Sequence, residues 1–217
     1  LASALDFVVG LGRPPPLETI MAKNASGRIL EQPLSLGGTV FDAGKRIRPI
    51  DIPLISQANV EKVSVHKVLN LCMSGICSEG TSASMHKILG TESIKLSETS
   101  EFPQGADRIK ARLTVLTADC DLLACKMTPD SALQSVLAAE GELVRIPLVY
   151  ADLPHFHVAR WKNTLVLCGP DTFEACVFIM TLILKPLARK LTGETGFALG
   201  QQRANLAAPV EGPRLVL

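Results

Sequence analysis

The sequence has almost no net charge and no long hydrophobic run, and each absence excludes a class of protein. Across 217 residues, 22 Lys and Arg face 21 Asp and Glu, which gives a formal charge of +1. Without a basic surplus, the chain lacks the overall field that draws proteins to nucleic acid or to anionic membranes. The longest apolar run, residues 175–184, is far shorter than the roughly 20 residues that a membrane helix requires. We therefore expect neither a nucleic-acid partner nor a membrane span.

Cysteine is also scarce, and a secretion signal is not visible. Six cysteines in a chain of this length are too few for the scaffold of a disulfide-rich secreted protein. Residues 1–12 are apolar but include Asp6 and lack a basic leader, so they do not predict a signal peptide. With 47% hydrophobic and 20% charged residues, the chain carries enough apolar surface to fold. We expect a globular, cytoplasmic protein with reduced thiols.

The second part of the sequence alternates short apolar runs with helical patterns. The short runs predict buried strands at residues 67–72, 121–125, 143–150 and 164–168. Apolar residues at helical spacing predict helices at residues 106–117, 131–139 and 172–191. Such alternation favours a parallel or mixed sheet that is covered by helices on both faces. The fold class is therefore α/β.

The first part of the sequence predicts a smaller α+β region. A helical pattern near residues 1–11 ends at three consecutive prolines, a short strand is expected at residues 39–41, and a helix at Pro49. The texture changes near Val63. We expect an N-terminal region at residues 1–62, an α/β domain at 63–193 and a C-terminal tail at 194–217.

Three stretches of the chain carry a resemblance to a known family. Residues 26–30 resemble its conserved Gly-Arg turn, residues 43–55 resemble the stretch before its pterin-binding domain, and residues 163–191 resemble its last strand, loop and helix. The family is that of MoeA and the gephyrin E domain, the molybdenum insertases of molybdenum-cofactor biosynthesis. This chain resembles a shortened member, because the family's lid-like domain is absent between Leu30 and Thr39.

The resemblance implies a fold, a ligand and a set of site residues. The fold is a three-layer α/β/α pterin-binding-type domain, and the activity is that of a molybdopterin molybdenumtransferase. The ligand is molybdopterin, a phosphorylated pterin; magnesium is compatible with such a site, and a homodimer is implied. Matching the family's three loops assigns Asp130 as the catalytic carboxylate. It assigns the cofactor-binding positions to Ser74, Gly75, Thr128, Ser131 and Gly169.

Several loops depart from the family's pattern. The family's acidic Ser-Thr-Gly-Asp-Glu loop corresponds to residues 73–77, which lack a carboxylate. Its glycine loop corresponds to residues 126–132, where Pro129 has no N–H to donate. Its phosphate-binding lysine falls on Leu153, beside Asp152, and losing one charge-assisted contact costs roughly 1.5–3 kcal/mol. These changes favour an alternative function, a catalytically inactive scaffold that keeps the fold and binds a partner protein.

Cysteines at the ends of three apolar runs leave a third hypothesis open. If the runs are neighbouring parallel strands, Cys72, Cys125 and Cys168 lie near one edge of the sheet. With Cys77 or His155 they would make a zinc-type ligand set. The spacing is not that of a short zinc knuckle, and cysteine is among the most buried residue types, so the metal ligands stay undetermined.

The remaining polar clusters have simpler structural interpretations. His155 and His157 would share one face of a strand, as ligands or acid–base groups must, but two histidines in a loop or strand are more often solvated or hydrogen-bonded to the backbone. Asp119 and Asp121 are expected to cap a turn before a strand. The basic cluster of residues 45–48 is expected on a solvated face.

Overall fold

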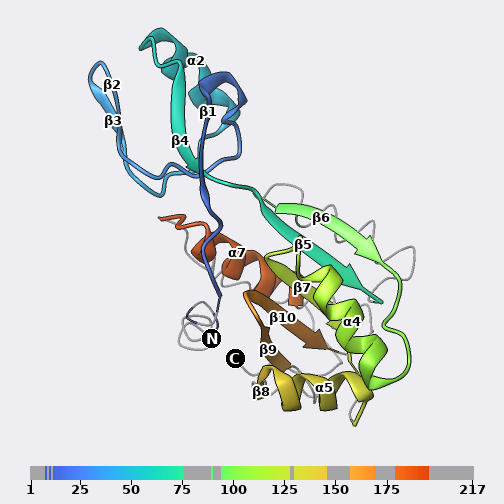
Figure 1. Cartoon of the computed structure of the whole chain (residues 1–217). Helices are drawn as coiled ribbons and strands as arrows, with labels where there is room; N and C mark the ends of the chain where they lie inside the picture. The colour runs from blue at the N-terminus through green and yellow to red at the C-terminus, as the bar shows by residue number, and fades with distance from the viewer. Residues whose placement is uncertain are drawn as a thin grey trace, which may run out of the picture.

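The protein consists of two units, a small N-terminal one and an α/β domain (Figure 1). The computed structural model describes residues 8, 10, 12–75, 89, 94–127, 130–145, 157–169 and 179–195. In Figure 1 the N-terminal unit stands at one end of the α/β domain, and the chain passes from one to the other between strands β4 and β5.

The N-terminal unit is built from two small antiparallel sheets and short helices. Strand β1 (Leu17–Met21) pairs with β4 (Lys62–His66), and β2 (Leu34–Leu36) pairs with β3 (Thr39–Phe41). The helical segments are η1 (Ala22–Asn24), η2 (Pro49–Asp51) and α2 (Ile52–Gln57). The predicted strand at residues 39–41 and the helix start at Pro49 are both confirmed.

Strand β4 packs with the N-terminal unit rather than with the α/β domain. Val63 and Val65 are buried in one cluster with Ile47, Ile55 and Leu30. Because this strand completes the core of the first unit, we propose that the division between the units lies between β4 and β5, a few residues after position 62.

Asp51 holds the start of the helical segment in place from a buried position. Its carboxylate accepts hydrogen bonds from the backbone N–H of Arg48 at 2.9 Å and from the Arg48 guanidinium, and Lys45 Nζ lies 3.7 Å away. Burial by itself would raise the pKa of this carboxyl. The hydrogen bonds from Arg48 and the charge of Lys45 outweigh burial, so the pKa lies below the ordinary value of 3.8.

This lowered pKa predicts a pH-dependent contribution to stability. Because the folded-state pKa is depressed, the contribution is present above pH 3.8 and is lost as the pH falls through the folded-state pKa. We expect Asp51→Asn to lower the free energy of unfolding by about 1–2 kcal/mol at pH 7. Urea unfolding at pH 7 and near pH 2.5 measures both values. A difference between variant and native protein that stays constant down to the lower pH would contradict this role.

The α/β domain contains a six-stranded mixed sheet. The strands are β5 (Leu69–Ser74), β6 (Ile94–Thr99), β7 (Leu122–Lys126), β8 (Glu142–Arg145), β9 (His157–Trp161) and β10 (Thr164–Gly169). They lie in the order β6-β5-β7-β10-β9-β8. Strands β6, β5, β7 and β10 are mutually parallel, whereas β9 is antiparallel to both of its neighbours. The prediction that three apolar runs form neighbouring parallel strands is confirmed for β5, β7 and β10.

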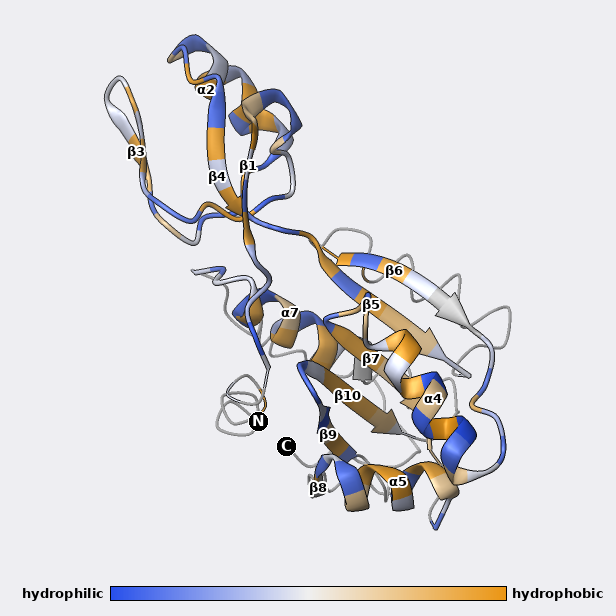
Figure 2. Cartoon of the chain, in the orientation of Figure 1, coloured by the Kyte–Doolittle hydropathy of each residue, from blue (hydrophilic) through white to orange (hydrophobic). Residues whose placement is uncertain are grey.

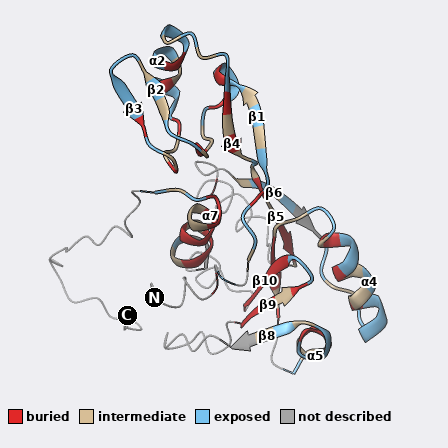
Figure 3. Ribbon diagram, turned by 60° about the vertical axis from the view of Figure 1, so that its left-hand side comes forward, coloured by how far each residue is buried: buried red, intermediate tan, exposed pale blue. Residues whose placement is uncertain are grey.

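Helices cover both faces of this sheet, as expected for an α/β fold. Helices α4 (Ala106–Leu116) and α5 (Ala132–Glu140) pack on one face. The π-helical turn η3 (Ile179–Leu184) and helix α7 (Lys185–Leu191) pack on the other. The central strands are the most hydrophobic segments of the domain (Figure 2) and are buried between the layers (Figure 3). The predicted three-layer α/β/α architecture is therefore confirmed.

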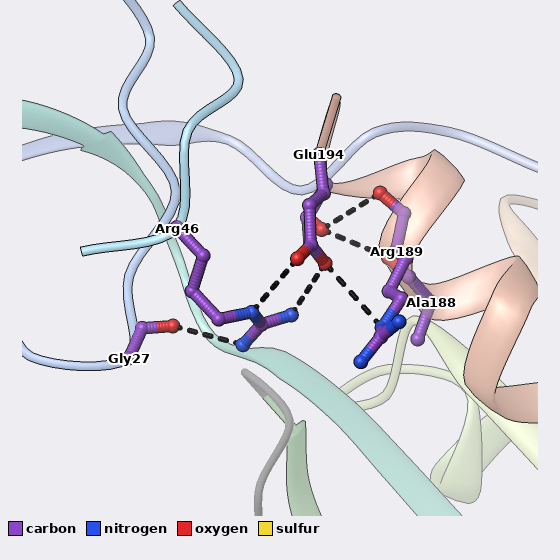
Figure 4. A network of polar contacts seen from close by, with 6 residues as sticks. Gly27, Arg46, Ala188, Arg189 and Glu194 are labelled. Atoms are coloured by element: carbon purple, nitrogen blue, oxygen red, sulfur yellow. Dashed lines mark hydrogen bonds and ion pairs between the residues drawn. The ribbon is translucent and has the colours of Figure 1, made fainter. Parts of the chain in front are cut away.

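The two units are joined by an ion-pair network around Glu194 (Figure 4). The Glu194 carboxylate accepts from Arg46 Nε at 3.0 Å and Nη2 at 2.6 Å, and Arg189 Nε lies 3.6 Å away. Arg46 also donates to the carbonyl of Gly27 at 3.1 Å. The Arg46 side chain is only 17% exposed. The expectation of a solvated basic face is therefore wrong for Arg46. Its guanidinium forms an ion pair with Glu194, which follows α7, and this pair connects α7 to the N-terminal unit.

None of the helices in these described ranges has both the length and the apolar character that crossing a bilayer requires.

Candidate functional site

A topological switch point lies between β5 and β7. The chain forms β6 on one side of β5 before it forms β7 on the other side. The connection from β6 to β7 contains α4, which packs on one face of the sheet. Leu89, from the connection between β5 and β6, packs into the cluster on the opposite face. The two connections therefore leave on opposite faces, and ligands of open α/β sheets bind at the carboxyl ends of such strands.

A cavity of about 500 Å³ lies at these strand ends. Its volume falls in the range of small-molecule sites, roughly 300–1,000 Å³. Its lining combines an apolar wall with a polar rim. The apolar wall is formed by Phe102, Pro103, Ile109, Met127, Ala132 and Leu133. The polar rim is formed by Ser74, Gly75, Glu101, Gln104, Gly105, Lys126 and Ser131.

Three of the residues assigned from the sequence line this cavity. Ser74 and Gly75 come from the end of β5, and Ser131 precedes α5. Ser74 is 1% exposed, and its hydroxyl donates to the carbonyl of Ser100 at 2.8 Å, so it connects β5 to the chain after β6. Gly75 has a φ of +68°, and a Cβ there would approach Glu101 Cγ to 2.8 Å. Only glycine fits this turn without moving its neighbour.

The other assigned residues lie beside the cavity or outside the described residues. Asp130 is exposed, has a φ of +56° and donates its backbone N–H to Gln134 Oε1 at 2.9 Å. Gly169 is buried at the end of β10, where its carbonyl accepts from the Met127 N–H at 3.0 Å. Neither is among the described lining residues. Thr128 falls outside the described residues.

Sequence reasoning missed the charged pair at the cavity. Lys126 is the last residue of β7, and Glu101 follows the end of β6. Lys126 Nζ lies 3.4 Å from Glu101 Oε1, and both side chains are more than one-third exposed. The signal for Lys126 was its place directly after a buried apolar run. Glu101 offered no such signal, because β6 was not predicted.

Two helices begin at this cavity. Helix α4 starts after Gly105 and α5 starts after Ser131, and both preceding residues line the cavity. The Ser131 hydroxyl accepts from the backbone N–H of Gln134 at 3.3 Å, whereas no side chain caps α4. Backbone N–H groups in a first helical turn lack partners within the helix and carry partial positive charge. Together with Lys126, the two helix starts favour an anionic ligand group.

Three of the described cysteines, Cys72, Cys125 and Cys168, are buried on the α4 and α5 face of the sheet. Cys125 and Cys168 are paired across β7 and β10 with their Sγ atoms 3.4 Å apart, and Cys72 packs in the same cluster. The contact with Cys168 and burial raise the pKa of Cys125 well above its ordinary value. Burial, followed by the charges of Cys72, Asp121 and Asp119, raises the pKa of Cys120 to about 12. The thiols of Cys120 and Cys125 therefore stay protonated at neutral pH.

The metal hypothesis finds no further support in the described ranges. Within them, no three His, Cys, Asp or Glu side chains come close enough together to hold a metal ion. Cys77 and His155, the suggested fourth ligands, fall outside those ranges, as does the loop with Asp152 and Leu153.

Two other polar residues named from the sequence, His157 and Asp121, lie within or beside strands of the sheet. His157 is buried on β9, opposite Cys168 on β10. The Asp121 carboxylate accepts the backbone N–H of Asn70 at 2.8 Å, so it joins the starts of β5 and β7. The prediction that Asp121 caps a turn is therefore not confirmed, because this hydrogen bond of the carboxylate goes to a neighbouring strand.

The fold and the cavity define a three-layer α/β protein with a cavity at a switch point. Solved structures share this fold. A molybdenum cofactor biosynthesis protein from Pyrococcus furiosus has a TM-score of 0.66 and 17% identity, covering 90% of this chain and 72% of the other. A molybdopterin biosynthesis moeA protein from Pyrococcus horikoshii has a TM-score of 0.67 and 12% identity, covering 90% and 80%. A further moeA structure from Pyrococcus horikoshii has a TM-score of 0.58 and 11% identity, covering 89% and 79%.

At these identities the similarity establishes the fold, which is that of MoeA-type proteins. Neither a protein-family model nor a curated protein matches the sequence.

Proposed function

We propose that this protein binds a phosphorylated pterin of the molybdopterin type in the cavity and acts in molybdenum-cofactor biosynthesis. The observation that carries the proposal is the convergence of two helix starts and Lys126 at the switch point between β5 and β7. The solved proteins with the same fold are molybdenum cofactor and molybdopterin biosynthesis proteins.

The two kinds of lining suit the two parts of such a ligand. Backbone N–H groups at the starts of α4 and α5 and the Lys126 ammonium would bind the phosphate. The apolar wall, with Phe102 and Met127, would pack against the planar ring system. Ser74, Gly75 and Ser131 belong to this proposed site, and Thr128 and Gly169 remain proposed cofactor-binding positions on the strength of the resemblance.

Lys126 supplies the sharpest test of phosphate binding. We expect Lys126→Gln to raise the Kd for molybdopterin roughly tenfold, because a charge-assisted contact worth about 1.4 kcal/mol is lost. Calorimetric titration of the full chain with molybdopterin, and with its adenylylated form, measures this change.

A matched control is available on the same α/β domain. Lys110 of α4 pairs with Glu140 of α5, so Lys110→Gln also removes a lysine from a partly exposed ion pair. Neither residue is among those that line the cavity. We expect this control variant to bind as the native protein does. Absence of heat and of thermal stabilisation at high micromolar ligand would instead support the catalytically inactive scaffold.

Magnesium has no complete site among the described lining residues. Glu101 is the one carboxylate in that lining, and it is paired with Lys126. Magnesium is often held by one or two carboxylates together with substrate phosphates, so these residues do not form a magnesium site by themselves. Asp130 adjoins the cavity through Ser131 and remains the proposed catalytic carboxylate. A cytoplasmic homodimer is also part of the proposal, and sedimentation equilibrium tests the dimer.

A further inference from the structure

The Glu101 side chain lies beside the end of β5, between Gly75 and Lys126. Its carboxylate reaches Lys126 Nζ, 3.4 Å away, from the chain that follows β6. Since β5 lies between β6 and β7, this ion pair bridges the two strands that flank β5. The Glu101 side chain also lies against Gly75, where a Cβ would come within 2.8 Å of its Cγ. The pair therefore spans the polar rim of the cavity.

The Glu101 carboxylate contacts Lys126 at the place where an anionic ligand would bind. Among the described residues that line the cavity, Lys126 is the one lysine, and none is an arginine. A phosphate that approaches Lys126 meets the negative charge of Glu101 and competes for the same ammonium group. The 70% exposure of the Glu101 side chain leaves it free to turn toward solvent when the ammonium is taken.

We infer that Glu101 is a built-in competitor that holds Lys126 in the ligand-free protein and is displaced by the phosphate of the ligand. This inference rests on the proposed function, because it assumes phosphate binding in the cavity. Its consequence is selectivity by charge. A singly charged carboxylate ligand gains nothing over Glu101, whereas a phosphate monoester offers a second negative charge and more acceptor oxygens. The site therefore selects phosphorylated ligands over carboxylated ones.

The test is a double-mutant cycle with inorganic pyrophosphate as the probe. Titrations of the full chain, followed by ¹H–¹⁵N NMR, give the Kd for the native protein, Glu101→Gln, Lys126→Gln and the double variant. We expect Glu101→Gln to lower the Kd about threefold, since a partly exposed ion pair need no longer be broken. On the Lys126→Gln background the same substitution should leave the Kd unchanged, because the competitor has lost its lysine.

Glu140→Gln is the matched control, since it removes a glutamate from the pair with Lys110 and should not change the Kd. Equal or weaker pyrophosphate binding by Glu101→Gln overturns the inference but leaves the proposed function standing. So does a threefold gain that persists without Lys126, because Glu101 would then act by general repulsion. No binding by either the native protein or Glu101→Gln overturns both. If the Glu101→Gln variant binds pyrophosphate and the native protein does not, the result supports the inference that Glu101 competes for Lys126.

Discussion

Replacing Leu122 with Ala is expected to destabilise the protein by about 3 kcal/mol. Leu122 begins β7 at the centre of the sheet, where it pairs with Leu71 of β5 and Leu165 of β10. Its side chain is fully buried on the face covered by α7. Deleting it removes apolar contacts and leaves a cavity that neighbours in three layers cannot easily fill. Chemical denaturation followed by circular dichroism measures the loss.

Val115→Ala provides the comparison for this substitution. Val115 lies on α4 in the same domain but is 63% exposed. Shortening an exposed side chain removes little buried surface, so we expect a change within about 0.5 kcal/mol. If the two variants were equally stable, β7 would not be the central strand of the folded sheet.

The second large effect is expected at Gly44, where the two units touch. Its φ is +80°, and a Cβ would come within 2.5 Å of the Gly193 carbonyl oxygen and 2.6 Å of Thr195 Cγ2. The Gly44 carbonyl accepts the Thr195 N–H at 2.9 Å, so the backbones are already in direct contact. We expect Gly44→Ala to lower the free energy of unfolding by about 3 kcal/mol, because left-handed strain adds to a backbone clash.

Gly27→Ala separates these two causes. Gly27 has the same φ of +80°, but a Cβ there would meet nothing within 4 Å. The variant therefore has the strain of a left-handed backbone conformation but no clash, and we expect the free energy of unfolding to fall by about 1 kcal/mol. Thermal unfolding of both variants measures the difference. Equal losses would mean that the contact between Gly44 and the chain after α7 contributes nothing to stability.

The two sites stabilise different parts of the protein. The central strands fix Ser74, Gly75 and Lys126 at one edge of the sheet. The network around Glu194 and the contact at Gly44 fix the N-terminal unit against the end of α7.

The central strands could be predicted from the sequence because they are almost completely buried. Strands β5, β7 and β10 are nearly continuous apolar runs because helices cover both of their faces. Strand β6 was missed because it lies at the edge of the sheet and alternates apolar residues with exposed ones such as Lys95 and Ser97. Strand β9 was missed because it carries His157 and Arg160 among its apolar residues, which obscures its pattern.

The sequence by itself determined the α/β class and the three central strands, because apolar patterning is a local property. The choice of Ser74, Gly75 and Ser131 came from the resemblance to the MoeA and gephyrin E-domain family, and all three line the cavity. Only the tertiary structure decided that Glu101 faces Lys126 and that Arg46 binds Glu194. These pairs join segments 25 and 148 residues apart. Such contacts depend on which strands are neighbours and how the two units meet, and no local pattern of residues encodes either.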